Sequence, residues 1–475
     1  MGLAQSFRRW DLVPLSVSSV GPLFSVAATG GVMVGAAGWW TLPAIGVLAA
    51  PFLVSSFVFR VLNRHFPHAG ASYHWSARVV GPAAARFQAW ILLLAYFASI
   101  PPIAIPAATY TLALVAPHAQ GNAAALTAVA LFWIAFAALP LLAGARPTAR
   151  LTQAFLAVEM LALAVLAVAG AARLSSLAVP VHFGPPPVAG MLVVAVVAAT
   201  ILDGWEIDSY AAEESRRPRQ DPGFGGIVGA FAALGFYAAI YPLMLAETPL
   251  ASLANAPDPM AVWGARLFPG QAWIVLVPVL ASTAGGLWLT TYILSRALFA
   301  MGREGLMPSG FARLSHRRVP TVAVVAPLAA TAVVVVLQLS FSSLGDFFRL
   351  LLSAAGFFLL LEFFLDSVTA TVFLTVGHRG LPDVQLSPHA HRGLAAAAAA
   401  STAVMGALLV AFFVYGPRAI GAGIDQTLAL LLAGGVIFAW ATRRRLVRPT
   451  PFHGRDSPEP VCPGPPSDPK AGGVS

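Results

Sequence analysis

The sequence contains very little cysteine and very little charge. Of its 475 residues, only one is cysteine and only 10% are charged, whereas 58% are hydrophobic. The lone Cys462 lies in a polar C-terminal stretch, so neither a disulfide framework nor a thiolate metal site is available. A soluble chain of this length needs far more charge to cover its surface. The scarcity of charge therefore excludes an ordinary soluble protein.

Signatures of catalysis are also missing. The sequence has no HExxH pair, no GxSxG elbow and no P-loop, and most of its ten histidines fall between the apolar runs. We therefore expect no enzymatic activity, no metal site and no cofactor. The net charge of +9 comes from arginines beside apolar segments, which is a topology signal of membrane proteins. A nucleic-acid partner is accordingly not expected.

Long apolar runs dominate what is present, and the mean hydropathy is +0.79. A helix needs about 20 apolar residues to cross the hydrocarbon core of a bilayer, and the alternating ten-residue segments typical of membrane barrels are missing. We predict an all-α polytopic protein with about twelve transmembrane helices. The expected spans are 12–38, 40–62, 84–116, 122–142, 150–174, 187–213, 225–248, 271–300, 320–341, 346–376, 394–415 and 420–442.

The arginines are distributed unevenly between the two sets of alternate loops. One set carries most of them, and the other carries only Arg173, Arg266, Arg349 and Arg418. The positive-inside rule then predicts an even number of spans, with both termini in the cytoplasm and the protein in the cell (inner) membrane. Residues 1–446 are expected to form a single membrane domain. Residues 447–475, rich in proline and polar residues, are expected to be a disordered cytoplasmic tail.

Two of the predicted spans are interrupted by residues that do not suit a membrane helix. Gly21 and Pro22 lie in the middle of the first span, and Asp203, Gly204 and Glu206 lie in the sixth. Proline removes a backbone donor and clashes with the preceding turn, so it breaks a helix. Broken helices at corresponding positions of two halves indicate a binding site at mid-membrane. A simple kink at Gly21 is the alternative.

Three further segments carry an ordered set of motifs. The loop after the second span contains Phe66, Pro67, Ala69, Gly70, Tyr73, Arg78, Gly81 and Pro82. The sixth span and the loop after it contain Gly204, Trp205, Glu213, Glu214 and Pro218. The end of the eighth span contains Ser295, Arg296, Phe299, Ala300, Met301, Arg303, Gly305 and Pro308. Together with the opening Trp10-Asp11-Leu12, this pattern resembles the amino acid–polyamine–organocation (APC) transporter superfamily over about residues 10–320.

The resemblance implies two inverted five-helix repeats plus two peripheral helices, with spans 1 and 6 broken. It also implies that the substrate lies between the two breaks, with Trp205 as a lid and with Tyr96 and Trp288 lining the pocket. The expected substrate-binding residues are Val20, Gly21, Pro22, Leu23, Phe24, Tyr96, Asp203, Gly204, Trp205, Glu206 and Trp288. For Trp205, simple packing is the alternative. The first break lacks the small residues that the family usually has there, which leaves fewer free amides for a substrate carboxylate.

Carboxylates inside the spans are the candidates for energy coupling, because burying one costs about 2.5–3.5 kcal/mol. The only lysine, Lys470, lies in the tail and cannot neutralise them. Glu159 falls where the resemblance places a lysine or a sodium ion in relatives. Glu362 and Asp366, four residues apart, share one helix face and can share a proton. For all three acids, structural hydrogen bonding is the alternative.

The function expected from the sequence is that of a secondary active transporter, or permease. It would move amino acids or related organic amines across the cell membrane by alternating access, as proton-coupled symport or exchange. Its partners are a small organic substrate, protons rather than sodium, and the lipid bilayer; no oligomeric state is assigned. The alternatives are a polyamine or organic cation transporter, and a substrate-binding sensor that keeps the fold without transport. The resemblance also makes four residues at helix ends candidates for a cytoplasmic gate: Arg78, Glu213, Glu214 and Arg296.

Overall fold

The computed structural model describes residues 2–254, 256–341, 343–377, 388–419 and 424–444, and this part of the chain is helical. It contains no strand, only an isolated bridge between Phe7 and Ser215. The α-helices are α1 Arg9–Val20, α2 Pro22–Ala37, α3 Thr41–His65, α4 Ala71–Val79, α5 Pro82–Ser99, α6 Pro101–Val115, α7 Ala123–Ala143, α8 Ala145–Leu177, α9 Val188–Leu202, α10 Ile207–Tyr210, α11 Phe224–Glu247, α12 Leu250–Ala254, α13 Pro259–Leu267, α14 Trp273–Arg303, α15 Thr321–Leu337, α16 Leu344–Val372, α17 Pro388–Ala419 and α18 Ile424–Ala441.

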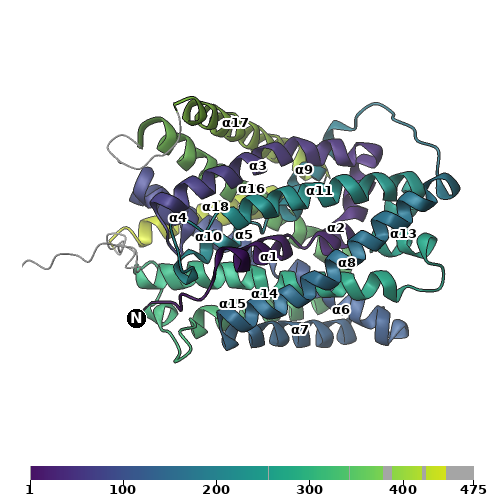
Figure 1. Ribbon diagram of the computed structural model, residues 1–475, viewed down its shortest axis with the longest axis horizontal. Coiled ribbons are helices and arrows are strands. Elements are labelled where there is room, and N and C mark those ends of the chain that lie inside the picture. Colours follow the sequence, from purple (N-terminus) through teal and green to yellow (C-terminus); the bar gives the residue numbers. More distant parts are fainter. Residues whose placement is uncertain (1, 255, 342, 378–387, 420–423, 445–475) are drawn as a thin grey trace, which may run out of the picture.

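The long helices run roughly along the longest axis of the molecule (Figure 1). Nine helical stretches of the described chain are long and apolar enough to cross a membrane, and the first of them, Arg9–His65, contains α1, α2 and α3. Two shorter apolar helices, Val188–Leu202 and Leu428–Ala441, add to these. The expectation of an all-helical membrane fold is confirmed. The twelve crossings in two inverted repeats stay a prediction, and the expected tail from residue 447 lies outside the described residues.

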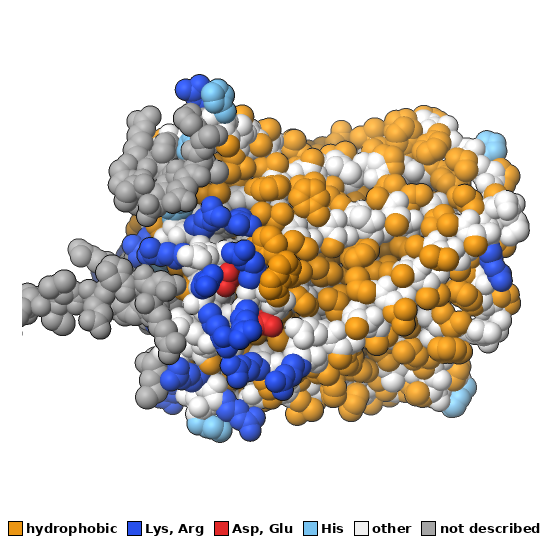
Figure 2. Space-filling model, viewed as in Figure 1, with side chains coloured by type: hydrophobic (Ala, Val, Ile, Leu, Met, Phe, Trp, Pro, Cys, Tyr) orange, Lys and Arg blue, Asp and Glu red, His pale blue; other side chains and the backbone are white. Residues whose placement is uncertain are grey.

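The surface has the pattern of a protein that spans a membrane. Figure 2 shows hydrophobic side chains over most of one face, with the basic side chains, all arginine in the described residues, gathered at the end where Figure 1 places the N-terminus. Large apolar side chains that are more than half exposed include Phe132, Leu139, Leu161 and Val168. Apolar exposure on this scale indicates contact with lipid rather than with water.

The first predicted break separates α1 from α2. Gly21 lies in the left-handed region, with φ of +56°, and Pro22 is the first residue of α2. Glycine adopts this conformation without steric cost, and proline is favoured at a helix start because its missing N–H would have no partner there. The Gly21–Pro22 pair thus ends one helix and begins the next within a single span.

The second break separates α9 from α10. Residues 203–206 are not helical, and Gly204 has φ of +105°. A Cβ atom added to Gly204 would lie 2.5 Å from the Ser19 carbonyl oxygen and 3.0 Å from the Val20 nitrogen. The two breaks therefore touch through their backbones, and only glycine allows this approach.

We predict that Gly204→Ala destabilises the protein by at least about 2 kcal/mol, because it adds both backbone strain and a backbone clash. Thermal unfolding of the purified protein in detergent measures this as a lower Tm. Gly235→Ala in α11 is the control, since nothing lies within 4 Å of its added Cβ. A Gly204→Ala protein as stable as the Gly235→Ala protein would contradict the close contact.

Candidate functional site

A cavity lies beside the two breaks, between α1, α2, α5, α6, α9, α14 and α16. Its volume is about 40 Å³. This is enough for a few water molecules, since each needs at least about 10–15 Å³ of such space. An organic solute would need the walls to move apart. The lining residues are Ser19, Val20, Phe24, Ser25, Ala28, Thr29, Ser99, Pro102, Ile103, Thr200, Ile201, Asp203, Gly286, Thr290, Phe348, Leu352 and Ala355.

The predicted substrate-binding residues divide into three groups around this cavity. Val20, Phe24 and Asp203 line it directly. A second group lies at the breaks without lining the cavity: Gly21, Pro22, Leu23, Gly204 and Glu206. Tyr96 belongs with this group because its hydroxyl donates to Glu206. The third group consists of Trp205 and Trp288, whose side chains do not line the cavity.

Trp205 packs in an aromatic cluster rather than over the cavity. Its ring centroid lies 5.1 Å from that of Phe59 and 5.6 Å from that of Phe363. Trp288 donates from Nε1 to Thr152 Oγ1 at 3.0 Å and packs edge-on against Phe155. In this structure both tryptophans thus have the geometry of packing residues.

Asp203 is the most unusual side chain at the cavity. It is only 9% exposed, its Oδ1 accepts from no donor among the described residues, and its carboxyl lies in hydrogen-bonding contact with the Glu206 carboxyl. It follows the last turn of α9, where the carbonyl ends of the helix add partial negative charge. None of the ion pairs in the described part of the chain includes it. A positively charged group is the partner that this environment lacks.

Glu206 differs from Asp203 because its oxygens already have partners. Its Oε2 accepts the Gly204 N–H at 2.9 Å, and its Oε1 accepts the Tyr96 hydroxyl at 2.8 Å. Buried polar groups of this kind are stable only when hydrogen-bonded. Glu206 therefore holds the α9–α10 break in shape and connects it to α5.

Glu159 performs a similar task at the first break. Its Oε1 accepts the Leu23 N–H at 3.0 Å and the Ser282 hydroxyl at 2.6 Å, and Ser282 Oγ in turn accepts the Phe24 N–H at 3.1 Å. The first N–H groups of a helix have no partner within that helix and attract anions. Glu159 and Ser282 thus occupy the donors at the start of α2, and they join α2 to α8 and α14.

Glu362 and Asp366 lie together in a buried polar network. Glu362 Oε1 accepts the Tyr210 hydroxyl at 3.2 Å, and Asp366 accepts from Ser72 Oγ at 2.9 Å and from Gln88 Nε2 at 2.7 Å. The network joins α16 to α4, α5 and α10. Glu362 Oε2 has no partner within the described chain.

The four gate candidates lie at the arginine-rich end, where one buried and one partly buried ion pair form. Arg296 donates to Glu214 Oε1 at 2.8 Å, and Tyr292 donates to Glu214 Oε2. Arg303, which the sequence pattern did not assign to the gate, is the cation that pairs with Glu213, at 2.6 Å. We call Glu213, Glu214, Arg296 and Arg303 the lock, because they tie the segment after α10 to α14. Arg78 lies on α4 and acts electrostatically on His68 nearby.

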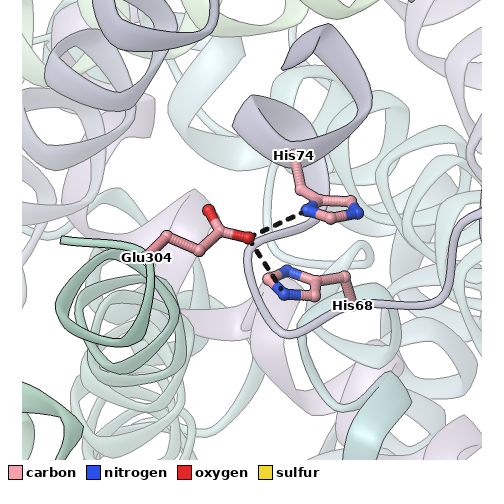
Figure 3. A group of neighbouring side chains, drawn as sticks. All are labelled: His68, His74 and Glu304. Carbon is pink, nitrogen blue, oxygen red and sulfur yellow. Dashed lines mark hydrogen bonds and ion pairs between the residues drawn. The ribbon is translucent and has the colours of Figure 1, made fainter. Parts of the chain in front are cut away.

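A cluster of His68, His74 and Glu304 adjoins the lock (Figure 3). The two imidazole rings stack at 3.8 Å, and both face Glu304 Oε1, at 3.3 Å from His68 Nε2 and 3.2 Å from His74 Nδ1. The set has the composition of a metal site. However, Gly70 N–H donates to His68 Nδ1, and the Arg303 guanidinium lies 2.6 Å from His68 Nε2. A cation there would meet the positive charge of Arg303, so the geometry fits a hydrogen-bonded cluster better.

The comparison with protein families identifies the fold and the class of protein. Residues 7–438 match the family model described as amino acid permease. The chain belongs to the amino acid permease family. This confirms the resemblance to the APC superfamily, and the members of this family are transporters of organic solutes rather than enzymes.

Individual relatives of this permease are also transporters. The methylthioribose transporter of Bacillus subtilis is 24% identical over 330 residues, 66% of this chain and 70% of the relative. The large neutral amino acids transporter small subunit 2 of Rattus norvegicus is 24% identical over 58% of this chain and 52% of its own length. Among solved structures, the Eremococcus coleocola manganese transporter superposes with a TM-score of 0.56 at 14% identity, covering 93% of this chain and 98% of that one. That likeness supports the fold alone.

The histidine cluster makes the permease sensitive to acid at this end. Burial lowers the pKa of His68 well below 6.5, and His74, Arg303 and Arg78 lower it further while Glu304 opposes them. Because the unfolded chain then binds a proton more readily than the folded one, stability is lost as the pH falls below about 6.5. We predict that Tm in detergent drops more between pH 7 and pH 5.5 for the wild type than for His68→Gln. Equal drops would mean that His68 takes up no proton in this range on unfolding.

Proposed function

We propose that this permease is a secondary active transporter that carries amino acids or related organic amines by alternating access. The observation behind the proposal is the unpartnered, buried Asp203 Oδ1 at a cavity where two broken helices meet. Breaks of this kind supply binding groups at mid-membrane without exposing backbone to lipid. The relatives named for large neutral amino acids and for methylthioribose support a small organic solute.

The small cavity and the lock together support a closed state of the transport cycle. About 40 Å³ cannot hold an amino acid, so the solute must enter and leave when the walls separate. The lock joins the segment after α10 to α14 by one buried and one partly buried ion pair at the arginine-rich end. We assign that end to the cytoplasm, by the positive-inside rule, with both termini inside the cell and the protein in the inner membrane. Opening the lock would release the solute into the cytoplasm.

Glu159 is the residue that we propose to couple transport to protons. It joins α8 to the start of α2 and to Ser282 of α14, so its protonation would alter contacts among three helices, of which α2 and α14 border the cavity. A proton drives the cycle only if the two access states bind it with different affinity. Glu362 and Asp366, in the network around Tyr210, are the proposed relay.

Uptake into proteoliposomes tests this function. We expect concentrative uptake of amino acids or amines when an inward proton gradient is imposed in sodium-free buffer. Glu159→Gln keeps an oxygen for the Leu23 N–H but cannot release a proton, so it should exchange solute across the membrane without accumulating it.

Two other outcomes favour the alternatives. Uptake that begins only when sodium is added would contradict proton coupling. Tight solute binding with neither uptake nor exchange would mean that the chain is a sensor that keeps the transporter fold.

A further inference from the structure

Most of the hydroxyl groups that line the cavity donate their proton to a backbone carbonyl. Four lining residues donate to backbone carbonyls of their own span, at 2.6–2.9 Å: Ser25 to Val20, Thr29 to Ser25, Ser99 to Ala95 and Thr200 to Val197. A hydroxyl has one proton to donate and two lone pairs with which to accept. These four oxygens therefore offer only acceptors to a solute in the cavity.

The backbone donors nearest to the cavity are also occupied. Leu23 N–H donates to Glu159 Oε1, and Phe24 N–H donates to Ser282 Oγ. Ser25 N–H donates to the Gly21 carbonyl at 2.8 Å, and Pro22 has no N–H. The start of α2, which could otherwise bind a carboxylate, is thus filled by a carboxylate from the chain itself.

Negative charge at the cavity has no matching positive charge. Asp203 Oδ1 lacks a partner, as does the hydroxyl of Ser19, another lining residue. The Asp203 carboxyl contacts that of Glu206 and lies near that of Glu362, and no ion pair of the described residues includes any of these three acids. A second carboxylate brought by a solute would be repelled, whereas an ammonium group would be attracted.

The remaining lining is apolar. Phe24, Ile103, Phe348 and Leu352 face the cavity from α2, α6 and α16. Such walls suit an aliphatic or aromatic body, since small-molecule sites combine apolar walls with a few placed polar groups.

We infer that the cavity selects an apolar organic amine without a carboxylate, whose ammonium donates to Asp203 Oδ1, to Ser19 Oγ and to the acceptor hydroxyls. This inference rests on the proposed function and narrows its substrate class. The preference for an amine arises because Glu159 already occupies the backbone donors at the start of α2, where the carboxylate of an amino acid would otherwise bind. An amine brings donors for Asp203 and the acceptor hydroxyls, whereas an amino acid also brings a carboxylate, for which the lining offers no cation.

Matched pairs of compounds that differ only in the carboxylate test the inference. The pairs are phenethylamine with L-phenylalanine, 3-methylbutylamine with L-leucine, and cadaverine with L-lysine; 3-phenylpropanoate tests the carboxylate alone. We expect the purified full-length protein to bind the amine of each apolar pair at least tenfold more tightly by calorimetry, and to bind 3-phenylpropanoate not at all. Cadaverine should bind more weakly than phenethylamine, because its second ammonium meets the apolar walls.

Asp203→Asn should weaken amine binding at least tenfold. Asp258→Asn is the matched control, because Asp258 caps α13 through the Ala261 N–H and Asn can accept the same bond.

Amino acids that bind as tightly as their amines would overturn the inference but leave the proposed function intact. Amine binding that survives Asp203→Asn would overturn the role of Asp203. No binding by any of these compounds, together with no uptake of them, would overturn both proposals.

Discussion

The backbone contact between the two helix breaks is the constraint on which the rest of the site depends. Gly204 packs on the Ser19 carbonyl without room for a side chain, and this brings the C-terminal ends of α1 and α9 together. Both ends carry partial negative charge, and Asp203 adds a full carboxylate beside them. A buried negative centre is costly unless protons or a cation balance it. The need for a positive partner therefore follows from the fold, before any particular solute is considered.

Features that depend on local chemistry could be predicted from the sequence. A glycine followed by a proline, and acids within an apolar run, predicted the interruptions at Gly21 and around Asp203, and the helices do end there. The apolar runs placed the helices to within a few residues, because burial in lipid requires about 20 such residues in a row. The ordered motifs predicted the family, which the match over residues 7–438 confirms.

Contacts between distant segments could not be predicted in this way. Trp205 lies within the second break, yet its ring packs with Phe59 and Phe363, because a side chain in a break can face toward the cavity or away from it. Arg303 pairs with Glu213 only because α14 places it opposite the segment after α10. The hydroxyls that line the cavity had no signal at all. Serine and threonine occur throughout the apolar spans and bond to their own helices, so no pattern marks the ones that face a solute.

Two of the internal carboxylates at the breaks, Glu159 and Asp203, lie at opposite ends of helix dipoles. Glu159 lies at the positive end of α2, where its Oε1 accepts two hydrogen bonds and its Oε2 has no partner among the described residues. Asp203 lies at the negative end of α9, beside the Glu206 carboxyl. The amides at the start of α2 stabilise a charged Glu159, which joins helices there, whereas the end of α9 and the neighbouring Glu206 disfavour a charged Asp203 unless a proton or a cation is present. At the arginine-rich end, Arg296 and Arg303 are already paired in the lock, and no ion pair of the described chain reaches Asp203. The described residues thus supply no cation for this carboxylate, and the balancing charge that we propose is a proton or the ammonium group of the transported solute.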